Sequence, residues 1–500
     1  MAIFLGIGLL SGVFKQNTTE DYLLAGKNVP PWLVGLSAIA TYCSGYMFVG
    51  QIGYTYTFGL SSVWVMFGFI VGDFLVSILV HQRLHQAIKG TQNLTYLSAF
   101  EHMAGCLLPW YRKIAGVLIT LFLCGYAAAQ FGAGSKALYV LFGWPYEIGA
   151  VIGALMVLVY CWAGGIRASI WTDVAQAVVM LTAMGVLAYQ GVLELGGVLS
   201  FWKQLHSVSV SYMDWFRPET HTFDPSGPWL FMLGWLVAGM GVVSQPHVMT
   251  RFMTLADEGH DKKQKDLGAD KRKKSSLSNM FWARAWYYAF YIIFYILTLG
   301  VSLTARLILP EISLQVFDAE LALPLLAEHL LSPLWVGLIL AGLFASTMST
   351  ADSQVLCCTA CITEDVRVAK GKPSYLFTKM VTVAVTALAL LIALKNNQSV
   401  FDLVNLSAGT MASLFSPLLI VLCLKTALKK HSIHLPVNEF IAFLMMAIGA
   451  VVHLYFRFYI TDALCYEVLP GIVSGLITYA LYLSIARGKV NSSLRTGEGT

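Results

Sequence analysis

Stretches without a charged residue recur along the chain at about the length of a membrane-spanning helix. A helix that crosses roughly 30 Å of hydrocarbon needs about 20 residues. Residues 28–72 contain no Asp, Glu, Lys or Arg, which leaves room for two helices joined by a turn around Gly59. Ten further apolar stretches fit one helix each: 114–135, 148–166, 174–193, 225–250, 285–305, 329–351, 377–394, 403–424, 440–456 and 468–486. The pattern predicts twelve full spans, preceded by a clipped first helix in the short apolar run 2–14.

The composition agrees with a chain that is mostly surrounded by lipid. Hydrophobic residues make up 57% of the 500 residues and charged residues only 12%, about half of the roughly 25% that is usual in soluble domains. So few charges cannot cover the surface of a soluble protein of this size. We therefore predict an all-α polytopic membrane protein in a lipid bilayer. The net charge of +5 does not indicate a nucleic-acid partner, because the basic residues are dispersed, and no feature indicates an obligate protein partner.

The distribution of basic residues predicts which side of the membrane each loop faces, because cytoplasmic loops carry an excess of Lys and Arg. Only five of the 32 Lys and Arg residues fall in one set of loops, whereas 24 fall in the alternate segments 15–31, 81–113, 250–277, 361–379, 425–437 and 487–500. We therefore place these segments, with the C-terminus, in the cytoplasm and the protein in the plasma (inner) membrane. The basic run 262–274 fits as a solvated loop; lipid or nucleic-acid binding is the alternative.

Two of the predicted spans are interrupted by residues that disfavour a continuous helix. The first interruption is Ala-Thr-Tyr-Cys-Ser-Gly-Tyr at 40–46, and the second, at 234–247, contains Gly239, Gly241 and Pro246. An unwound helix at membrane depth frees backbone carbonyls, which are ligands for an alkali cation. Close helix packing through small residues is the alternative interpretation. Interruptions in corresponding helices of two halves are also what an inverted repeat would show.

A stripe of hydroxyl groups is the third polar feature within a span. Ser346, Ser349, Thr350 and Ser353 recur at intervals of three and four residues, so they share one helical face beside Asp352. Hydroxyls that face unwound carbonyls would form an oxygen cage that suits Na⁺ better than a divalent ion.

Two further carboxylates, Asp73 and Asp173, lie at membrane depth. A buried carboxylate is costly and needs a partner or a function. Arg167, six residues before Asp173, lies on a different helical face and is not an obvious partner. A structural polar clamp and an ion-linked role are both open for each carboxylate.

In their order and spacing, several short motifs resemble the sodium/solute symporter family, and within it the sodium/proline symporter branch. The resemblance extends from about residue 21 to 487. It is carried by Asp-Tyr-Leu-Leu-Ala-Gly at 21–26, the interruption at 40–45, Gly-Gly-Ile-Arg-Ala-Ser-Ile-Trp-Thr-Asp at 164–173, Gln-Pro-His at 245–247 with Arg-Phe-Met at 251–253, and Met-Ser-Thr at 348–350 leading to Ile-Thr-Glu-Asp at 362–365.

The resemblance implies about 13 transmembrane helices, of which the second to eleventh form two LeuT-like inverted five-helix repeats. On this basis we expect a clipped first helix and cytoplasmic loop at 1–31, a first inverted repeat at 32–200 and an external loop at 201–227. The second inverted repeat is expected at 228–425, two C-terminal helices at 426–486 and a cytoplasmic tail at 487–500.

The resemblance also implies the sites. Na⁺, as the coupling ion, would be bound by the carbonyls of Ala40 and Cys43 with Ser346, Ser349 and Thr350. A second cation position would involve Asp173, Asp352 and Ser353. The solute would lie against Ser44, Gly45, Tyr46, Gly50 and Tyr126, and against the segment from Trp235 to Pro246.

The expected function is Na⁺-coupled import of a small organic solute, proline or a related amino acid, by alternating access. Tyr42 replaces an aspartate of the proline carriers, and Ala238 and Val242 stand where those carriers place an aromatic pair. These differences leave room for a monocarboxylate- or pantothenate-type carrier, and a transporter-like membrane sensor is a further alternative. We do not expect an enzyme, since the chain contains no HExxH, GxSxG or phosphate-binding glycine loop.

Overall fold

The computed structural model describes residues 2–89, 91, 94–209, 211–216, 227–256, 269–309, 318–367, 371, 373–395, 399–428, 435–460 and 465–496. These residues form helices, and they contain one isolated β-bridge, between Val29 and Leu255, but no β-strand. The N-terminal half contains α1 (Ala2–Ser11), α2 (Thr19–Leu24), α3 (Pro31–Tyr42), α4 (Gln51–Phe58), α5 (Val63–Ile88), α6 (Tyr96–Ala104), α7 (Pro109–Phe142), α8 (Tyr146–Glu194) and α9 (Val198–Val208). The C-terminal half contains α11 (Gly227–Met240), α12 (Pro246–Met253), α13 (Ala269–Ile308), α14 (Ala322–Leu330), α15 (Pro333–Ala360), α16 (Tyr375–Lys395), α17 (Val400–Leu428), α18 (Glu439–Tyr459) and α19 (Val468–Thr496).

Ten helical stretches in the described part of the chain are long and apolar enough to cross a membrane. Two of them bend sharply at a glycine. The 49-residue helix α8 bends at Gly165, and the stretch 46–88 bends at Gly59, where both glycines have a positive φ. When α8 is divided at this bend, and when α3 is joined to the helical turns up to Phe58, the twelve predicted spans are all present. The short α1 precedes them, so the predicted helix count is confirmed.

Gly165 shows why the bend in α8 needs a glycine. Its φ of 57° lies in the left-handed region, and a Cβ at this position would come within 2.4 Å of the Tyr22 carbonyl oxygen. Glycine alone combines that backbone conformation with so close an approach. The bend therefore separates two spans and seats the end of α2 against α8.

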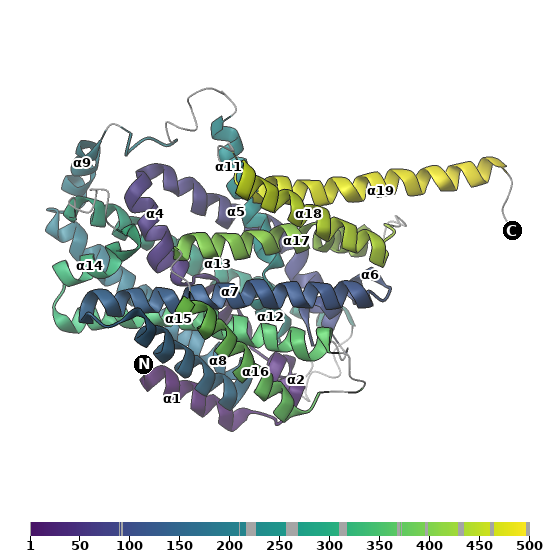
Figure 1. The fold of residues 1–500 in the computed structure, drawn as a ribbon, viewed down its shortest axis with the longest axis horizontal. Helices are drawn as coiled ribbons and strands as arrows, with labels where there is room; N and C mark the ends of the chain where they lie inside the picture. The colour runs from purple at the N-terminus through teal and green to yellow at the C-terminus, as the bar shows by residue number, and fades with distance from the viewer. Residues whose placement is uncertain are drawn as a thin grey trace.

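The long helices run side by side along the longest axis of the molecule (Figure 1). Helices α9 and α14 lie at one end and α6 lies at the other, so these two ends correspond to the predicted external and cytoplasmic sides. Helix α19 extends beyond the rest of the bundle and continues to Thr496, so most of the predicted tail 487–500 is helical. The predicted external loop 201–227 begins inside α9, and residues 210 and 217–226 of it lie outside the described part, as do residues 262–268 of the basic run 262–274.

The centre of the bundle is where α3 and α15 meet. Helix α15 packs against α7 and α8, and α3 packs against α8, α13 and α15. All residues of α15 from Gly342 to Thr359 are buried, although they include many hydroxyl groups and a carboxylate. Polar groups buried at membrane depth must find partners, and those partners define the sites described next.

Candidate functional site

Helix α3 ends in the middle of the bundle rather than at its surface. Its last residue is Tyr42, and Cys43 leaves the helical conformation with φ −73° and ψ 67°. The Ser44 amide nitrogen lies 2.8 Å from the Tyr42 carbonyl oxygen and donates to it, which closes a tight turn. The chain then continues as a π-helical turn over Tyr46–Gly50. The interruption predicted at 40–46 is therefore present. It leaves the last carbonyls of α3 without the hydrogen bonds of a continuing helix.

The hydroxyl stripe of α15 lies against these carbonyls. Ser349 Oγ donates to the Ala40 carbonyl at 2.9 Å, and Thr350 Oγ1 donates to the Thr41 carbonyl at 2.8 Å. Both hydroxyls also lie within hydrogen-bond distance of the Ser346 carbonyl in their own helix, at 3.0 Å and 3.1 Å. Ala40, Thr41, Ser349 and Thr350 are all completely buried. The two segments thus form one oxygen-rich contact that contains no charged group.

The other two residues predicted for this site make different contacts. The hydrogen bonds of Ser346 and Cys43 stay within their own helices, from Ser346 Oγ to the Leu343 carbonyl at 2.8 Å and from the Cys43 amide to the Ile39 carbonyl at 2.7 Å. The Thr41 carbonyl, which was not predicted, takes part instead. Its position next to Ala40 at the end of the helix could have indicated it.

The residues predicted for a second cation also come together, one helical turn further along α15. The Asp352 carboxylate accepts from Ser353 Oγ and from Ser169 Oγ, both at 2.8 Å. Asp173 lies on α8 and accepts from Ser37 Oγ of α3 at 2.5 Å. Both carboxylates are completely buried. Helices α3, α8 and α15 therefore each contribute to one polar cluster.

Arg251 lies inside this cluster, and its predicted place in a cytoplasmic loop is wrong. Its side chain is 1% exposed, and its guanidinium lies 3.2 Å from Asp173 and 3.6 Å from Asp352. It also donates to Ser169 and Ser353. Helix α12 follows the second interruption inside the bundle and packs against α3 and α15, which brings the guanidinium to the two carboxylates. Two acidic residues at membrane depth require a cation, and that requirement was the signal for Arg251 in the sequence.

Arg167 and Asp73, the other charged residues that the sequence places in or beside the predicted spans, each have a partner outside this cluster. Arg167 pairs with Asp21 at 2.5 Å rather than with Asp173, in agreement with its different helical face. Asp73 accepts a 3.1 Å hydrogen bond from the Tyr288 hydroxyl. Asp73 is therefore clamped to α13, away from the cluster that contains Asp173.

Thr41 connects the hydroxyl stripe to the charged cluster. Its carbonyl accepts from Thr350, while its hydroxyl lies 3.0 Å from Ser353 Oγ and 3.5 Å from Asp173 Oδ2. Thr41 is therefore hydrogen-bonded to the stripe through its backbone and lies against the charged cluster through its side chain, so that a shift of this residue affects both.

The residues after the interruption face α7. Ser44 Oγ lies 3.3 Å from the Tyr126 hydroxyl, and the Gly45 amide donates to Gln130 Oε1 at 2.8 Å. A Cβ at Gly45 would lie 2.9 Å from the Ala133 side chain and 3.0 Å from Gln130 Oε1, so the close approach requires glycine. The chain on this side of the interruption is thereby fixed to α7.

A small cavity of about 30 Å³ lies between Tyr42 at the end of α3, the second interruption and α17. Ser44 and Gly45 are not among the residues that line it. Such a volume holds one or two water molecules. Its polar lining is uncharged and includes Tyr42, Tyr126, Gln245, His247, Asn405 and Tyr466. Gln245 Oε1 and His247 Nδ1 are buried, and neither has a hydrogen-bond partner among the described residues. These two atoms are free to hydrogen-bond a small polar molecule in the cavity.

The predicted solute residues surround this cavity to different degrees. Tyr126 lines it, and Trp235 lies behind the wall, where it stacks on Tyr466 with ring centroids 4.3 Å apart. Ala238 and Val242, which replace the aromatic pair of the proline carriers, line it as well. Pro246 begins α12 between the lining residues Gln245 and His247 but is not itself part of the wall.

Tyr46 and Gly50 lie next to Phe401 of α17 rather than in the cavity wall. The rings of Tyr46 and Phe401 stack at 5.2 Å, and a Cβ at Gly50 would lie 3.1 Å from the Phe401 side chain. Gln130, Asn405 and Phe401 were not predicted, because an isolated polar or aromatic residue in an apolar span gives no periodic signal.

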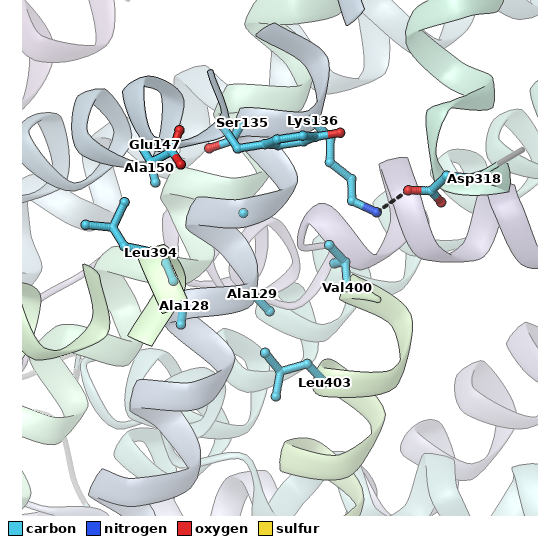
Figure 2. A pocket seen from close by; sticks show the side chains of 13 residues that line it. Ala128, Ala129, Ser135, Lys136, Glu147, Ala150, Asp318, Leu394, Val400 and Leu403 are labelled. Carbon is cyan, nitrogen blue, oxygen red and sulfur yellow. Dashed lines mark hydrogen bonds and ion pairs between the residues drawn. The ribbon is translucent and has the colours of Figure 1, made fainter. Parts of the chain in front are cut away.

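A larger cavity of about 470 Å³ lies at the predicted external end of α7. Figure 2 shows Lys136 extending across it toward Asp318, to which it is paired at 2.6 Å. Lys136 also pairs with Glu320 at 2.5 Å, and Glu320 accepts from the amides of Val400 and Phe401. This network fixes the start of α17, and with it the Phe401 ring that stacks on Tyr46.

Comparison with known proteins agrees with this architecture over nearly the whole chain. The model of the sodium:solute symporter family matches residues 22–428. The osmoregulated proline transporter OpuE of Bacillus subtilis (strain 168) is 24% identical over 502 aligned positions, covering 96% of this chain and 93% of that protein. The sodium/proline symporter of Staphylococcus aureus is 26% identical over 494 positions, covering 96% and 90%.

Solved structures show the same fold. A Na⁺-coupled sialic acid symporter in a substrate-bound outward-open state superposes with a TM-score of 0.76 at 20% identity, covering 96% of each chain. Mhp1, a nucleobase-cation-symport-1 family transporter in a closed conformation, superposes with a TM-score of 0.57 at 15% identity, covering 92% of each chain. These structures support the LeuT-like arrangement of the helices. The chain belongs to the sodium:solute symporter family and is a multi-pass secondary transporter rather than an enzyme.

Proposed function

We propose that this protein imports proline, or a closely related small amino acid, together with Na⁺. The observation that carries the proposal is the contact of Ser349 and Thr350 with the carbonyls of Ala40 and Thr41, where α3 is interrupted. Uncharged oxygens from two helices suit a monovalent hard cation, whereas a divalent ion would require carboxylate ligands. Na⁺ is here a transported substrate, bound by the carbonyls of Ala40 and Thr41 and the hydroxyls of Ser349 and Thr350. The Cys43 carbonyl and the Ser346 hydroxyl, which the sequence also predicts, are further oxygens near this contact.

The central cavity supports a small solute without net charge. Its lining contains hydroxyl, amide and imidazole groups but no carboxylate, ammonium or guanidinium among the described residues. An amino-acid zwitterion can satisfy such groups, whereas a ligand with net charge would lack a counter-ion. The relatives named as proline transporters agree with this solute class.

The interrupted segment explains how the two ligands are coupled. Ala40 and Thr41 lie on one side of the interruption, and Ser44 and Gly45 lie on the other, where they contact α7. Na⁺ that fixes the end of α3 therefore also orders the backbone beside the solute, so each ligand raises the affinity for the other. A membrane potential of 100 mV with a tenfold Na⁺ gradient supplies about 3.7 kcal/mol, which concentrates a neutral solute roughly 500-fold per Na⁺.

The distribution of Lys and Arg supports a plasma (inner) membrane location with the C-terminus in the cytoplasm.

A small monocarboxylate is the second candidate solute. Ala238 and Val242 line the cavity where the proline carriers place an aromatic pair, which leaves room for a different solute. A monocarboxylate would lack a counter-ion in this lining, so the amino acid is preferred.

Uptake by the purified protein in proteoliposomes tests the proposal. We expect radiolabelled proline to accumulate when an inward Na⁺ gradient is applied and not when K⁺ replaces Na⁺. Unlabelled amino acids and monocarboxylates are added as competitors at fixed Na⁺. Competition by monocarboxylates but not by amino acids would replace the proposed solute class. Solute binding without any Na⁺-driven flux would indicate a sensor instead of a carrier.

A further inference from the structure

Another large cavity lies at the end of the bundle that contains α6 (Figure 1). It has a volume of about 530 Å³, within the roughly 300–1,000 Å³ that ligand sites occupy. Its walls come from the end of α5, from α6 and from the end of α17, three helices that contact one another in pairs. All of its lining residues fall within 81–113 and 425–437, two segments that the distribution of Lys and Arg predicts to be cytoplasmic. The cavity therefore lies at the predicted cytoplasmic face of the membrane.

Two cations line this cavity without an acidic residue to balance them. Arg83 and Lys425 belong to the lining, together with the polar side chains of Gln86 and His102, and no Asp or Glu is among the described residues that line it. In the described part of the chain, neither cation pairs with a carboxylate. Like charges that share a partly enclosed cavity repel each other and attract an anion to it.

Each cation also has a structural role, which uses only part of its hydrogen-bonding capacity. Arg83 Nη1 donates to the Leu79 carbonyl at 2.6 Å, one turn earlier in α5. Lys425 Nζ donates to the Ala104 carbonyl at the end of α6. Basic residues near helix ends commonly make such contacts. A guanidinium carries five N–H donors and an ammonium three, so both groups retain donors for an anion.

The surroundings of the cavity favour a lipid headgroup as the source of that anion. Leu107 and Trp110, which follow α6, are exposed, and so is Leu424, the residue before Lys425. Exposed apolar side chains at a membrane interface contact lipid, and tryptophan is enriched there. The cytoplasmic leaflet carries anionic phospholipids, and basic pockets between helices on that side bind their headgroups. A free phosphate ion would need the two charges but not the apolar surface beside them.

We propose that this cavity binds the phosphate group of an anionic phospholipid of the cytoplasmic leaflet, with Arg83 and Lys425 as its cationic ligands. The acyl chains extend along the exposed apolar surface next to Leu107 and Leu424. The site shares no lining residue with the central cavity. It is therefore independent of the proposed solute and of the proposed Na⁺ site.

Lipid binding to the purified protein in detergent tests the proposal. Phosphatidylglycerol and phosphatidylcholine with the same acyl chains are titrated, and bound lipid is measured by native mass spectrometry. Both lipids contain a phosphate, but only phosphatidylglycerol has a net negative charge, so we expect it to bind about tenfold more tightly. Equal affinities for the two lipids would overturn the proposal. Displacement of phosphatidylglycerol by an equal concentration of inorganic phosphate would also overturn it, because the site would then recognise the free ion.

Variants of the two cations make the test specific. In Arg83→Gln/Lys425→Gln, the affinity for phosphatidylglycerol should fall about tenfold. Lys113→Gln/Arg367→Gln is the matched control, because it removes two charges from the same predicted side of the membrane. Both control residues lie over aromatic rings and outside the cavity lining, so the affinity should stay within a factor of two of the wild type. Equal losses in the two double variants would mean that only the overall charge matters, and would overturn the site.

A charge added to the cavity covers the case in which Arg83→Gln/Lys425→Gln does not fold. Gln86 lines the cavity and is exposed, so the fold should tolerate Gln86→Glu. Its carboxylate would repel a lipid phosphate, and we expect the affinity for phosphatidylglycerol to fall about fivefold. Gln190→Glu is the matched control, because Gln190 is also exposed but lies on α8 near the predicted external end. Equal binding by the two variants would contradict the proposal.

Discussion

Ser349 and Ala40 are 309 positions apart in the chain, yet the Ser349 hydroxyl donates a 2.9 Å hydrogen bond to the Ala40 carbonyl. The contact joins the two predicted inverted repeats at the point where α3 is interrupted. It matters because a serine in a membrane helix ordinarily bonds back to its own helix, and Ser346 does so. Ser349 and Thr350 lie within hydrogen-bond distance of their own helix as well, but they also reach across to α3, where the interruption makes backbone carbonyls available.

The first prediction concerns these two hydroxyls. In the Ser349→Ala/Thr350→Ala variant, the Na⁺ concentration for half-maximal uptake should rise at least tenfold, because two of the proposed oxygen ligands are removed. That change corresponds to about 1.4 kcal/mol. Thr182→Ala is the matched control, since the Thr182 hydroxyl bonds within its own helix on an exposed face. If the double variant retains the Na⁺ dependence of the wild type, the Na⁺ site lies elsewhere.

The second prediction concerns the backbone beside the solute. Gly45→Ala should raise the solute concentration for half-maximal uptake by tenfold or more, because the added methyl group would collide with Ala133 and Gln130 on α7. Gly132→Ala on α7 serves as the control, because nothing lies within 4 Å of a Cβ at Gly132. Solute affinity and Na⁺ affinity are measured separately by uptake titrations. Equal kinetics for both variants would contradict the assignment of Gly45 to the solute site.

The sequence was sufficient for the helices and for half of the central site. Charge-free stretches of the length of the bilayer specify spans directly, and the residues at 40–46 and 346–353 differ from their apolar surroundings in a recognisable way. Arg251 was missed because a basic residue after an apolar stretch has the pattern of a loop, and only the tertiary structure returns it to the bundle. Gln130 and Phe401 were missed because each is a single residue whose role depends on a partner far away in the chain.

The third prediction concerns the bend in α8. Gly165→Ala should lower the thermal midpoint of the detergent-solubilised protein by several degrees, since a backbone with φ 57° and ψ −141° costs residues other than glycine on the order of 1–3 kcal/mol. The methyl group would also collide with the Tyr22 carbonyl. Gly185→Ala on the same helix has open space and should leave the midpoint unchanged or raise it. A Gly165→Ala variant as stable as the Gly185→Ala variant would mean that α8 does not need this bend.

The fourth prediction concerns the network at the predicted external end. Glu320 holds the start of α17 through two backbone amides and pairs with Lys136. Glu320→Gln weakens these charge-assisted bonds, so Phe401 and Tyr46 should separate more often and open a path toward the interruption. The buried thiol of Cys43 reports this opening when it is the only cysteine left in the protein. A membrane-impermeant maleimide should then modify Cys43 at least threefold faster in Glu320→Gln.

Asp318→Asn is the control that separates this effect from a general loss of charge. Asp318 pairs with the same lysine, but its side chain is 42% exposed, and exposed ion pairs contribute little. The labelling rate of Cys43 in Asp318→Asn should therefore stay within a factor of two of the parent. Proline together with Na⁺ should slow the labelling in every variant, because both ligands favour the ordered segment around Cys43. Equal labelling rates in the two variants would show that Glu320 does not hold the external side closed.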